Sequence, residues 1–204
     1  MVSFKPVRIA ACAALAASLT ATALPAQAEP RAYRIDPSHF SIVFNAMHIG
    51  YAPTWGLFLK GEGGFTYDED TRELSDLSVT IEAGSVFTND ERRDGHLRSD
   101  DFLSAEAHPS ITFVMTDAQP KTDTSGTVTG DLTLRGVTRP VTLDVTLNKI
   151  GPYPFGGTYV VGISASTVLK RSDFGMTYAV ADGLVGDEVT VRIDLEAIRQ
   201  QPAP

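Results

Sequence analysis

The sequence predicts an all-β fold, an eight-stranded antiparallel up-and-down barrel with a short helical flap around residues 88–106. Eight segments alternate apolar and polar residues, and this period of two sends successive side chains to opposite faces of a strand. Most connections between the segments are short, and closing such a sheet into a barrel removes its exposed edges. Because alternation alone does not distinguish a barrel from a β-sandwich, the sandwich stays open as the alternative. The eight predicted strands are 38–49, 57–67, 77–83, 110–118, 127–134, 141–149, 158–170 and 188–196.

The first two predicted strands are flanked by residues that interrupt regular pairing. Pro37 restricts the residue before it to an extended or turn conformation, so residues 31–37 are expected to lead into the first strand without belonging to it. Residues 50–56, which carry the only Trp, are expected to form a loop. Three glycines within 61–64 predict a bulge, a bend or a close approach, as a barrel corner requires.

The helical flap is predicted from its end signals. Thr88 is expected to be the N-cap, because Glu91 follows it at the spacing of a capping box. Pro109 prevents further helix and returns the chain to a strand. The apolar anchors expected to hold the flap on the barrel are Leu97, Phe102 and Leu103.

The inward rows of the predicted strands contain small residues that leave room inside the barrel. Eight strands enclose just enough space for side chains or for one small ligand. The rows hold no converging group of polar or titratable side chains, so a cavity there would suit an apolar chain. A filled core is the alternative that the alternation leaves open. The small residues are Ala46, Ala83, Gly130 and Ala165.

The first 28 residues have the pattern of a secretory signal peptide. Lys5 and Arg8 precede an apolar run over 9–19, and an A-x-A site ends at Ala28, so a mature domain over 29–204 is expected. The apolar run is too short to span a bilayer. Without this segment and its two basic residues, 15 Lys and Arg remain against 25 Asp and Glu, a net charge of −10. This charge argues against nucleic acid and anionic membrane surfaces as partners.

The sequence offers few candidate catalytic or metal-binding residues. None of the four histidines forms an H-x-x-x-H or H-E-x-x-H pair, so no metal site is predicted. The run 36–39 (DPSH) gathers three residue types of a catalytic triad, but sequence neighbours rarely achieve triad geometry, and a surface turn is expected instead. No catalytic residue is predicted. A lipid-processing enzyme that uses His48 or His96 stays an alternative, and it would require a paired acid or base.

Several motifs resemble those of the YceI-like, polyisoprenoid-binding periplasmic family. They are DPSHFSIVF near the start, RRDGHLRSDDF followed by HPSITF in the centre, GDLTLRGVTRPVTLDV further on, and RSDFG near the end. The resemblance implies an extended lipocalin-like barrel, export to the periplasm, and a binding protein that is not an enzyme. It implies a long isoprenoid or quinone-like lipid as the ligand and no other cofactor.

The predicted site follows from strand parity and from these motifs. The expected partner is an apolar long-chain lipid, with no nucleic acid and no stable membrane insertion. A homodimer and a filled-core interaction module are left open. The residues expected to line the tunnel are Phe40, Ile42, Phe44, Ala46, His48, Val79, Ile81, Phe113, Met115, Leu132, Leu143, Val145, Val161, Ile163, Ala165, Val191 and Ile193. Those expected to shape the rim or flap are Asp36, His39, Arg93, Asp94, His96, Asp101, Phe102, Arg171 and Asp173.

Overall fold

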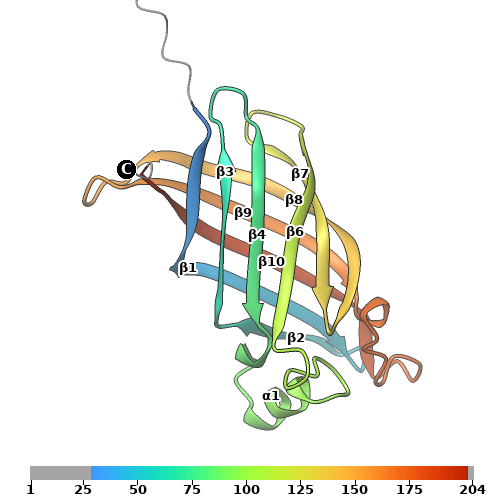
Figure 1. Cartoon of the computed structure of the whole chain (residues 1–204). Helices are drawn as coiled ribbons and strands as arrows, with labels where there is room; N and C mark the ends of the chain where they lie inside the picture. Colours follow the sequence, from blue (N-terminus) through green and yellow to red (C-terminus); the bar gives the residue numbers. More distant parts are fainter. Residues whose placement is uncertain (1–28, 202–204) are drawn as a thin grey trace, which may run out of the picture.

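The structure is a computed structural model that describes residues 29–201, and it is a barrel of long strands with a small helical cap at one end (Figure 1). The predicted signal peptide, residues 1–28, lies outside the described residues. The helical elements are η1 (Ala83–Ser85), α1 (Glu91–Arg98) and η2 (Arg171–Phe174). The strands are β1 (Arg31–His48), β2 (Ala52–Phe58), β3 (Gly61–Tyr67), β4 (Leu74–Glu82), β5 (Val86–Phe87), β6 (Ser110–Pro120), β7 (Ser125–Leu134), β8 (Val137–Pro152), β9 (Tyr159–Lys170) and β10 (Val185–Arg199).

The sheet closes on itself, which confirms the predicted barrel. Its order is β10-β9-β8-β7-β6-β4-β3-β1, and β1 pairs back with β10, so eight strands form the closed circuit. Every pairing is antiparallel. The first half of β1 pairs with β3 and its second half pairs with β2, so β2 and β3 act as one bent strand beside β1.

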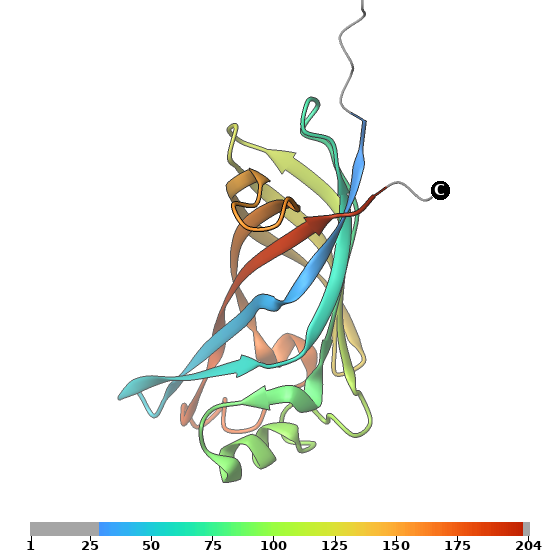
Figure 2. The ribbon, with the colours of Figure 1, turned by 90° about the vertical axis from the view of Figure 1, so that its left-hand side faces the viewer.

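The prediction that residues 31–37 precede the first strand was wrong. β1 starts at Arg31, and its first residues already pair with both β3 and β10. Pro37 is accommodated because the pairing of β1 with β10 shifts register between Ile35 and Phe40. A bulge interrupts the ladder, so the missing N–H of proline costs no hydrogen bond there. Figure 2 shows that β1 bends partway along its length.

The predicted loop over residues 50–56 is mostly strand. Only a tight turn of three residues, 49–51, separates β1 from β2; the Tyr51 N–H donates to the His48 carbonyl at 3.0 Å, and φ is positive at Ile49 (50°) and Gly50 (72°). Trp55 therefore lies within β2, opposite Asn45 of β1. The glycine prediction is confirmed: a Cβ on Gly64 would lie 2.6 Å from the Tyr33 carbonyl oxygen, so only glycine permits this approach of β3 to β1.

The helical flap is present, but its start differs from the prediction. Asp90, not Thr88, is the N-cap of α1, and its carboxylate accepts a hydrogen bond from the Arg93 backbone N–H at 2.9 Å. This bond lowers the pKa of the Asp90 carboxyl. Thr88 does not cap the helix because its backbone N–H and hydroxyl both donate to the buried Asp94 carboxylate, at 2.7 and 2.5 Å.

Two groups of buried side chains fill opposite ends of the barrel. We call the end formed by residues 83–109 and 171–184 the flap end, and the opposite end, where β1 starts and β10 finishes, the closed end. The core of the flap end includes Val86, Leu103 and Phe174. The core of the closed end consists of Tyr33, Ile35, Phe65, Val161 and Ala197.

Candidate binding cavity

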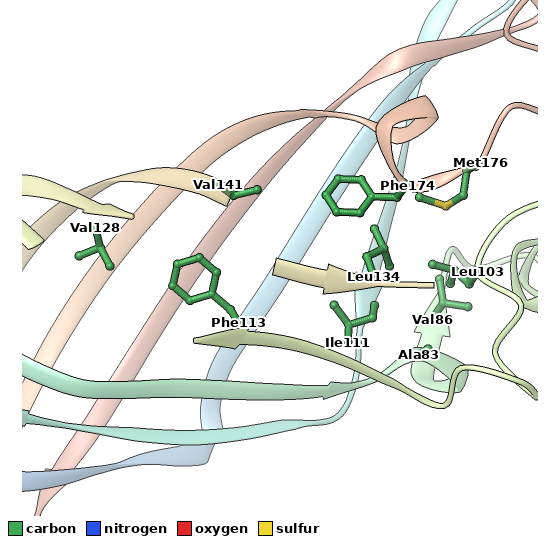
Figure 3. Packing of buried hydrophobic residues seen from close by; sticks show 10 residues of the cluster. All are labelled: Ala83, Val86, Leu103, Ile111, Phe113, Val128, Leu134, Val141, Phe174 and Met176. Atoms are coloured by element: carbon green, nitrogen blue, oxygen red, sulfur yellow. The ribbon is translucent and has the colours of Figure 1, made fainter. Parts of the chain in front are cut away.

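A cavity of about 260 Å³ lies inside the barrel between its two ends. Its wall is apolar throughout, although Thr167 and Arg171 are among the residues around it. The volume is close to the lower end of typical small-molecule pockets, roughly 300–1,000 Å³. At the flap end the cavity reaches the cluster in Figure 3, whose residues come from β5 to β8, from η1, from the flap and from the segment after β9.

The closed end stops the cavity. Tyr33, Ile35, Val161 and Ala197 are at most 2% exposed, yet none of them lines the cavity, whereas Phe65 below them does. The rings of Tyr33 and Phe65 stack with centroids 5.4 Å apart. These side chains therefore form a packed plug across the barrel.

A polar hub ties the strands together outside this plug. The Glu69 carboxylate, in the turn between β3 and β4, accepts hydrogen bonds from the hydroxyl groups of Tyr33 at 3.3 Å and Tyr159 at 2.7 Å. Burial raises the pKa of both phenols, and the neighbouring carboxylate raises it further, so they stay protonated donors. The Arg199 guanidinium lies over the Tyr159 ring at 3.8 Å. One carboxylate thus joins β1, β9 and the β3–β4 turn.

Most of the residues expected to line the tunnel surround the cavity, because strand parity holds along the regular part of the wall. Their predicted role in ligand binding stays a prediction. The residues that line the cavity as expected are Phe40, Ile42, Phe44, Ala46, Val79, Ile81, Phe113, Leu132, Leu143, Val145, Ile163, Ala165, Val191 and Ile193.

Three expected residues do not line the cavity. His48 continues the row of Ala46, since β1 pairs regularly with β2 as far as His48 and Ala52, but it is exposed at the end of β1, beyond the cavity wall. Met115 packs against the core of the flap end, and the register between β6 and β7 shifts directly after it. Val161 has the expected parity but lies in the plug of the closed end.

Sequence reasoning missed the part of the wall that irregular segments supply. Leu97 and Leu103 of the flap line the cavity, whereas the sequence predicts them only as apolar anchors. Phe174 and Met176 follow β9, line the cavity and are 2% and 6% exposed. They lie outside the alternating strands, so no sequence periodicity indicates that they face the interior. Phe102 and Arg171, expected at the rim, also belong to the wall.

Arg171 organises the segment after β9. Its side chain is buried, and its guanidinium lies 5.5 Å from the centroid of the Phe102 ring. Burial lowers the pKa of Arg171, an effect that the Asp187 carboxylate opposes, and an arginine stays charged at neutral pH. No carboxylate is within ion-pair distance of it in the described residues. Its N–H groups instead donate at 2.8 Å to the backbone carbonyls of Met176, Tyr178, Val185 and Gly186.

The flap is held by a second buried polar group. The Asp94 carboxylate accepts from Thr88, and the Arg93 side chain donates to the Thr88 hydroxyl and carbonyl oxygens, both at 2.7 Å. Arg135, in the turn between β7 and β8, donates to the Asp100 carbonyl at 2.7 Å and also to the Gly175 carbonyl. The flap and the segment after β9 are therefore fixed to each other through the β7–β8 turn.

His96 and Asp101 lie on the outside of the flap. The His96 Nε2 and an Asp101 carboxylate oxygen are 2.9 Å apart. The His96 ring also meets the rings of Phe102 and Tyr178 edge-on, with centroids 4.9 Å away in each case. This pair holds the flap against the segment after β9 and does not face the cavity.

Asp36 and His39 are not at the rim, contrary to expectation. They lie at the bulge of β1, where the His39 Nδ1 is 2.9 Å from an Asp36 carboxylate oxygen and Ser38 donates to the other oxygen. These bonds lower the pKa of Asp36 to about 2 and raise that of His39. Asp173 is exposed at the flap end, and its backbone carbonyl accepts a hydrogen bond of 3.4 Å from the Arg139 side chain.

Residues 29–201 contain neither a cluster of metal-ligand side chains nor a membrane-spanning helix. No three His, Cys, Asp or Glu side chains come together there in a group that could hold a metal ion. Among the helices of the same residues, none is long and apolar enough to cross a membrane.

Known proteins resemble this chain in both sequence and fold. Residues 33–197 match the model of the YceI-like domain. The UPF0312 protein of Pseudomonas aeruginosa is 40% identical over 176 residues, which are 85% of this chain and 90% of that relative. The solved structure of the Campylobacter jejuni YceI protein has a TM-score of 0.70 at 29% identity, covering 76% of this chain and 90% of that one. The solved structure of a polyisoprenoid-binding domain from Saccharophagus degradans has a TM-score of 0.60 at 17% identity. The match covers 83% of this chain and 99% of that domain.

Proposed function

The chain belongs to the YceI-like family, and we propose that it holds one long apolar lipid chain, of the polyisoprenoid or quinone type, inside the barrel. The observation that carries the proposal is the continuous apolar wall of the cavity. Each methylene group moved from water into such a wall contributes roughly 0.8 kcal/mol. The Saccharophagus domain, at 17% identity, supports the fold alone, so the ligand class rests on the chemistry of the cavity.

The protein would act as a periplasmic carrier or store that keeps the tail of its lipid out of water, including under stress. The pattern of residues 1–28 supports export, and their cleavage stays a prediction. The plug at the closed end would leave the flap end as the route for the chain to enter and leave. The polar head group, for which the wall offers no partner, would then stay near the flap.

The cavity favours binding without chemistry. Catalysis requires an acid, base or nucleophile within reach of the reacting atoms. His48 is exposed at the end of β1, and His96 lies outside the flap, so neither lines the cavity. The lipid-processing enzyme is therefore the weaker hypothesis. The cavity also disfavours a filled-core interaction module, because side chains leave about 260 Å³ inside the barrel.

Extraction of purified protein with organic solvent, followed by mass spectrometry, tests this proposal. We expect a lipid with a long isoprenoid tail to co-purify in an amount comparable to the protein. Protein stripped of lipid should take up a ubiquinone or a polyprenyl alcohol and lose it again to solvent. A protein that carries no lipid and takes up neither compound would contradict the proposal.

A further inference from the structure

Exposed apolar side chains gather where β1 turns into β2 at the flap end. The backbone N–H of Ile49 in this turn donates to the Leu184 carbonyl at 2.8 Å, so the hairpin lies beside the segment that leads into β10. We call this surface the apolar tip. Its residues and exposed fractions are Met47 43%, Ile49 46%, Tyr51 89%, Trp55 57%, Tyr178 46% and Leu184 45%.

The apolar tip is continuous with the wall of the cavity. Met47 follows Ala46, and Leu184 precedes Val185, and both Ala46 and Val185 line the cavity. Successive side chains of a strand point to opposite faces, so the same backbone presents one side chain inside and the next outside. Tyr178 continues the surface from another side, since its ring lies 5.4 Å from that of the wall residue Phe102.

The hairpin has the composition of a surface that meets apolar material. Residues 40–59 contain no Asp, Glu, Lys or Arg, although about one residue in five of the whole chain is charged, 42 of 204. Beyond its pairing with β1, β2 pairs within the described residues only at Leu57 and Phe58, with β5. The hairpin projects from the barrel in Figure 2. A projecting edge with uncovered aromatic side chains is a liability in water unless something covers it.

We propose that the apolar tip docks on the surface of an electrically neutral lipid bilayer, where the cavity loads and unloads its lipid. The proposal rests on the proposed function, because a lipid that enters at the flap end must pass this surface. Tyr and Trp prefer the interface of a bilayer, where the ring is apolar and the hydroxyl or N–H group stays hydrated. The hairpin offers no Lys or Arg to anionic head groups, and the chain carries a net charge of −8. Contact is therefore peripheral and does not depend on anionic lipid.

Trp55 provides a direct reporter, because it is the only Trp of the chain and belongs to the apolar tip. Purified protein is mixed with vesicles of phosphatidylcholine, with and without phosphatidylglycerol, and the Trp55 emission is recorded. We expect a shift to shorter wavelength with neutral vesicles, quenching by brominated phosphatidylcholine, and no stronger effect with anionic vesicles. An emission spectrum that neutral vesicles leave unchanged would overturn the proposal, as would binding that requires phosphatidylglycerol.

A matched pair of variants locates the contact. Tyr51→Asp changes the most exposed residue of the apolar tip, and Phe155→Asp changes a residue that is 78% exposed in the β8–β9 turn of the closed end. Tyr51→Asp should weaken binding to vesicles by on the order of tenfold, because binding scales with the apolar area that enters the interface. Phe155→Asp should leave it unchanged. Equal weakening by both variants would contradict the assigned surface.

The outcomes separate docking from lipid holding. Neither Tyr51 nor Phe155 lines the cavity, so both variants should keep co-purified lipid. If lipid co-purifies but vesicles do not bind, docking fails and the proposed function stands; if vesicles bind but no lipid is held, the proposed function fails alone. Light scattering tests whether the apolar tip instead contacts a second copy of the chain. A dimer that Tyr51→Asp converts to a monomer, together with indifference to vesicles, would assign the apolar tip to self-association and overturn the proposal.

Discussion

The two ends of the barrel bury their side chains by different means. At the closed end, regular strands supply the whole plug, and its residues keep the alternation of their strands. At the flap end, residues from the flap and from the segment after β9 enter the interior, and buried polar groups hold these segments in place. The first arrangement leaves no space, whereas the second leaves a cavity.

This difference indicates how one fold can be both rigid and able to admit a ligand. Strand pairing fixes the closed end, and the Glu69 hub adds side-chain bonds around it. The flap end has few ladder bonds, so its stability depends on side chains such as Arg171 and Asp94 that satisfy the backbone groups of irregular chain. Segments of this kind open more readily than a strand core.

The largest expected effect comes from breaking the flap end at Arg171. Arg171→Met fills similar space but leaves four carbonyl groups, one buried and three partly buried, without this donor. Because each unsatisfied buried group costs roughly 1–3 kcal/mol, we expect the free energy of unfolding to fall by about 3 kcal/mol or more. Denaturation by urea measures this change, and hydrogen exchange should show faster opening of residues 176–186 than of the closed end.

The control for this variant is Arg139→Met. Arg139 is exposed, and its side chain donates a single hydrogen bond, of 3.4 Å, to the Asp173 carbonyl in the described residues. We expect a change within about 0.5 kcal/mol, as for most surface substitutions. If both variants lowered stability equally, Arg171 would not be the anchor that the geometry indicates.

The same enlargement at both ends compares packing directly. Ala197 is 0% exposed in the plug, and Ala165 is 8% exposed on the cavity wall. Ala197→Leu should overpack the closed end and cost about 1–3 kcal/mol, whereas Ala165→Leu should cost less than about 1 kcal/mol because its side chain enters open space. Thermal unfolding of the two variants measures both losses of stability. A larger loss for Ala165→Leu than for Ala197→Leu would contradict a cavity beside Ala165.

The smallest expected effect is a dependence on pH at the β1 bend. The pKa of Asp36 is lowered from 3.8 to about 2, so its contribution is present above about pH 4 and is lost as the pH falls toward 2. The pKa of His39 is raised above 6.5, so its contribution is present below that value and is lost as the pH rises through the raised pKa. The pair therefore stabilises most between about pH 4 and 6.5.

Nuclear magnetic resonance of the His39 ring measures this coupling. Asp36→Asn should return the pKa of His39 toward 6.5. Because both groups lie on the outer wall, the substitution should leave lipid content unchanged. A His39 pKa that does not respond to Asp36→Asn would show that the two side chains are not coupled in solution.

Alternation of the sequence predicted the regular wall because each strand obeys a local rule. The rows that contain Phe40 and Ala165 line the cavity as expected. The rule does not show where a row leaves the barrel: His48 follows Ala46 in its row but lies at the exposed end of β1, beyond the cavity wall. It also gives parity without position along the barrel, so it could not separate Val161 in the plug from Ile163 on the wall.

The flap end could not be predicted to the same depth. Thr88 has the spacing of a capping box, but a buried Asp94 takes its hydroxyl and leaves the cap to Asp90. Arg171 belongs to a recognisable motif, yet its bonds go to carbonyls that the sequence does not mark. Such anchors depend on contacts between distant segments, and neither the periodicity nor the composition of the sequence predicts these contacts.

The central claim is that an apolar chain occupies the interior beside Ala165, and a pair of tryptophan variants tests it most directly. Ala165→Trp places a large ring in the cavity, and Ser166→Trp places it on the outer face. Ser166 is a cleaner control than Ser164, whose hydroxyl donates to Asp194 at 2.6 Å. Lipid bound to each variant is measured by mass spectrometry, with a thermal melt to confirm folding. The account predicts that folded Ala165→Trp loses its lipid while Ser166→Trp keeps it; equal lipid content in the two folded variants would contradict it.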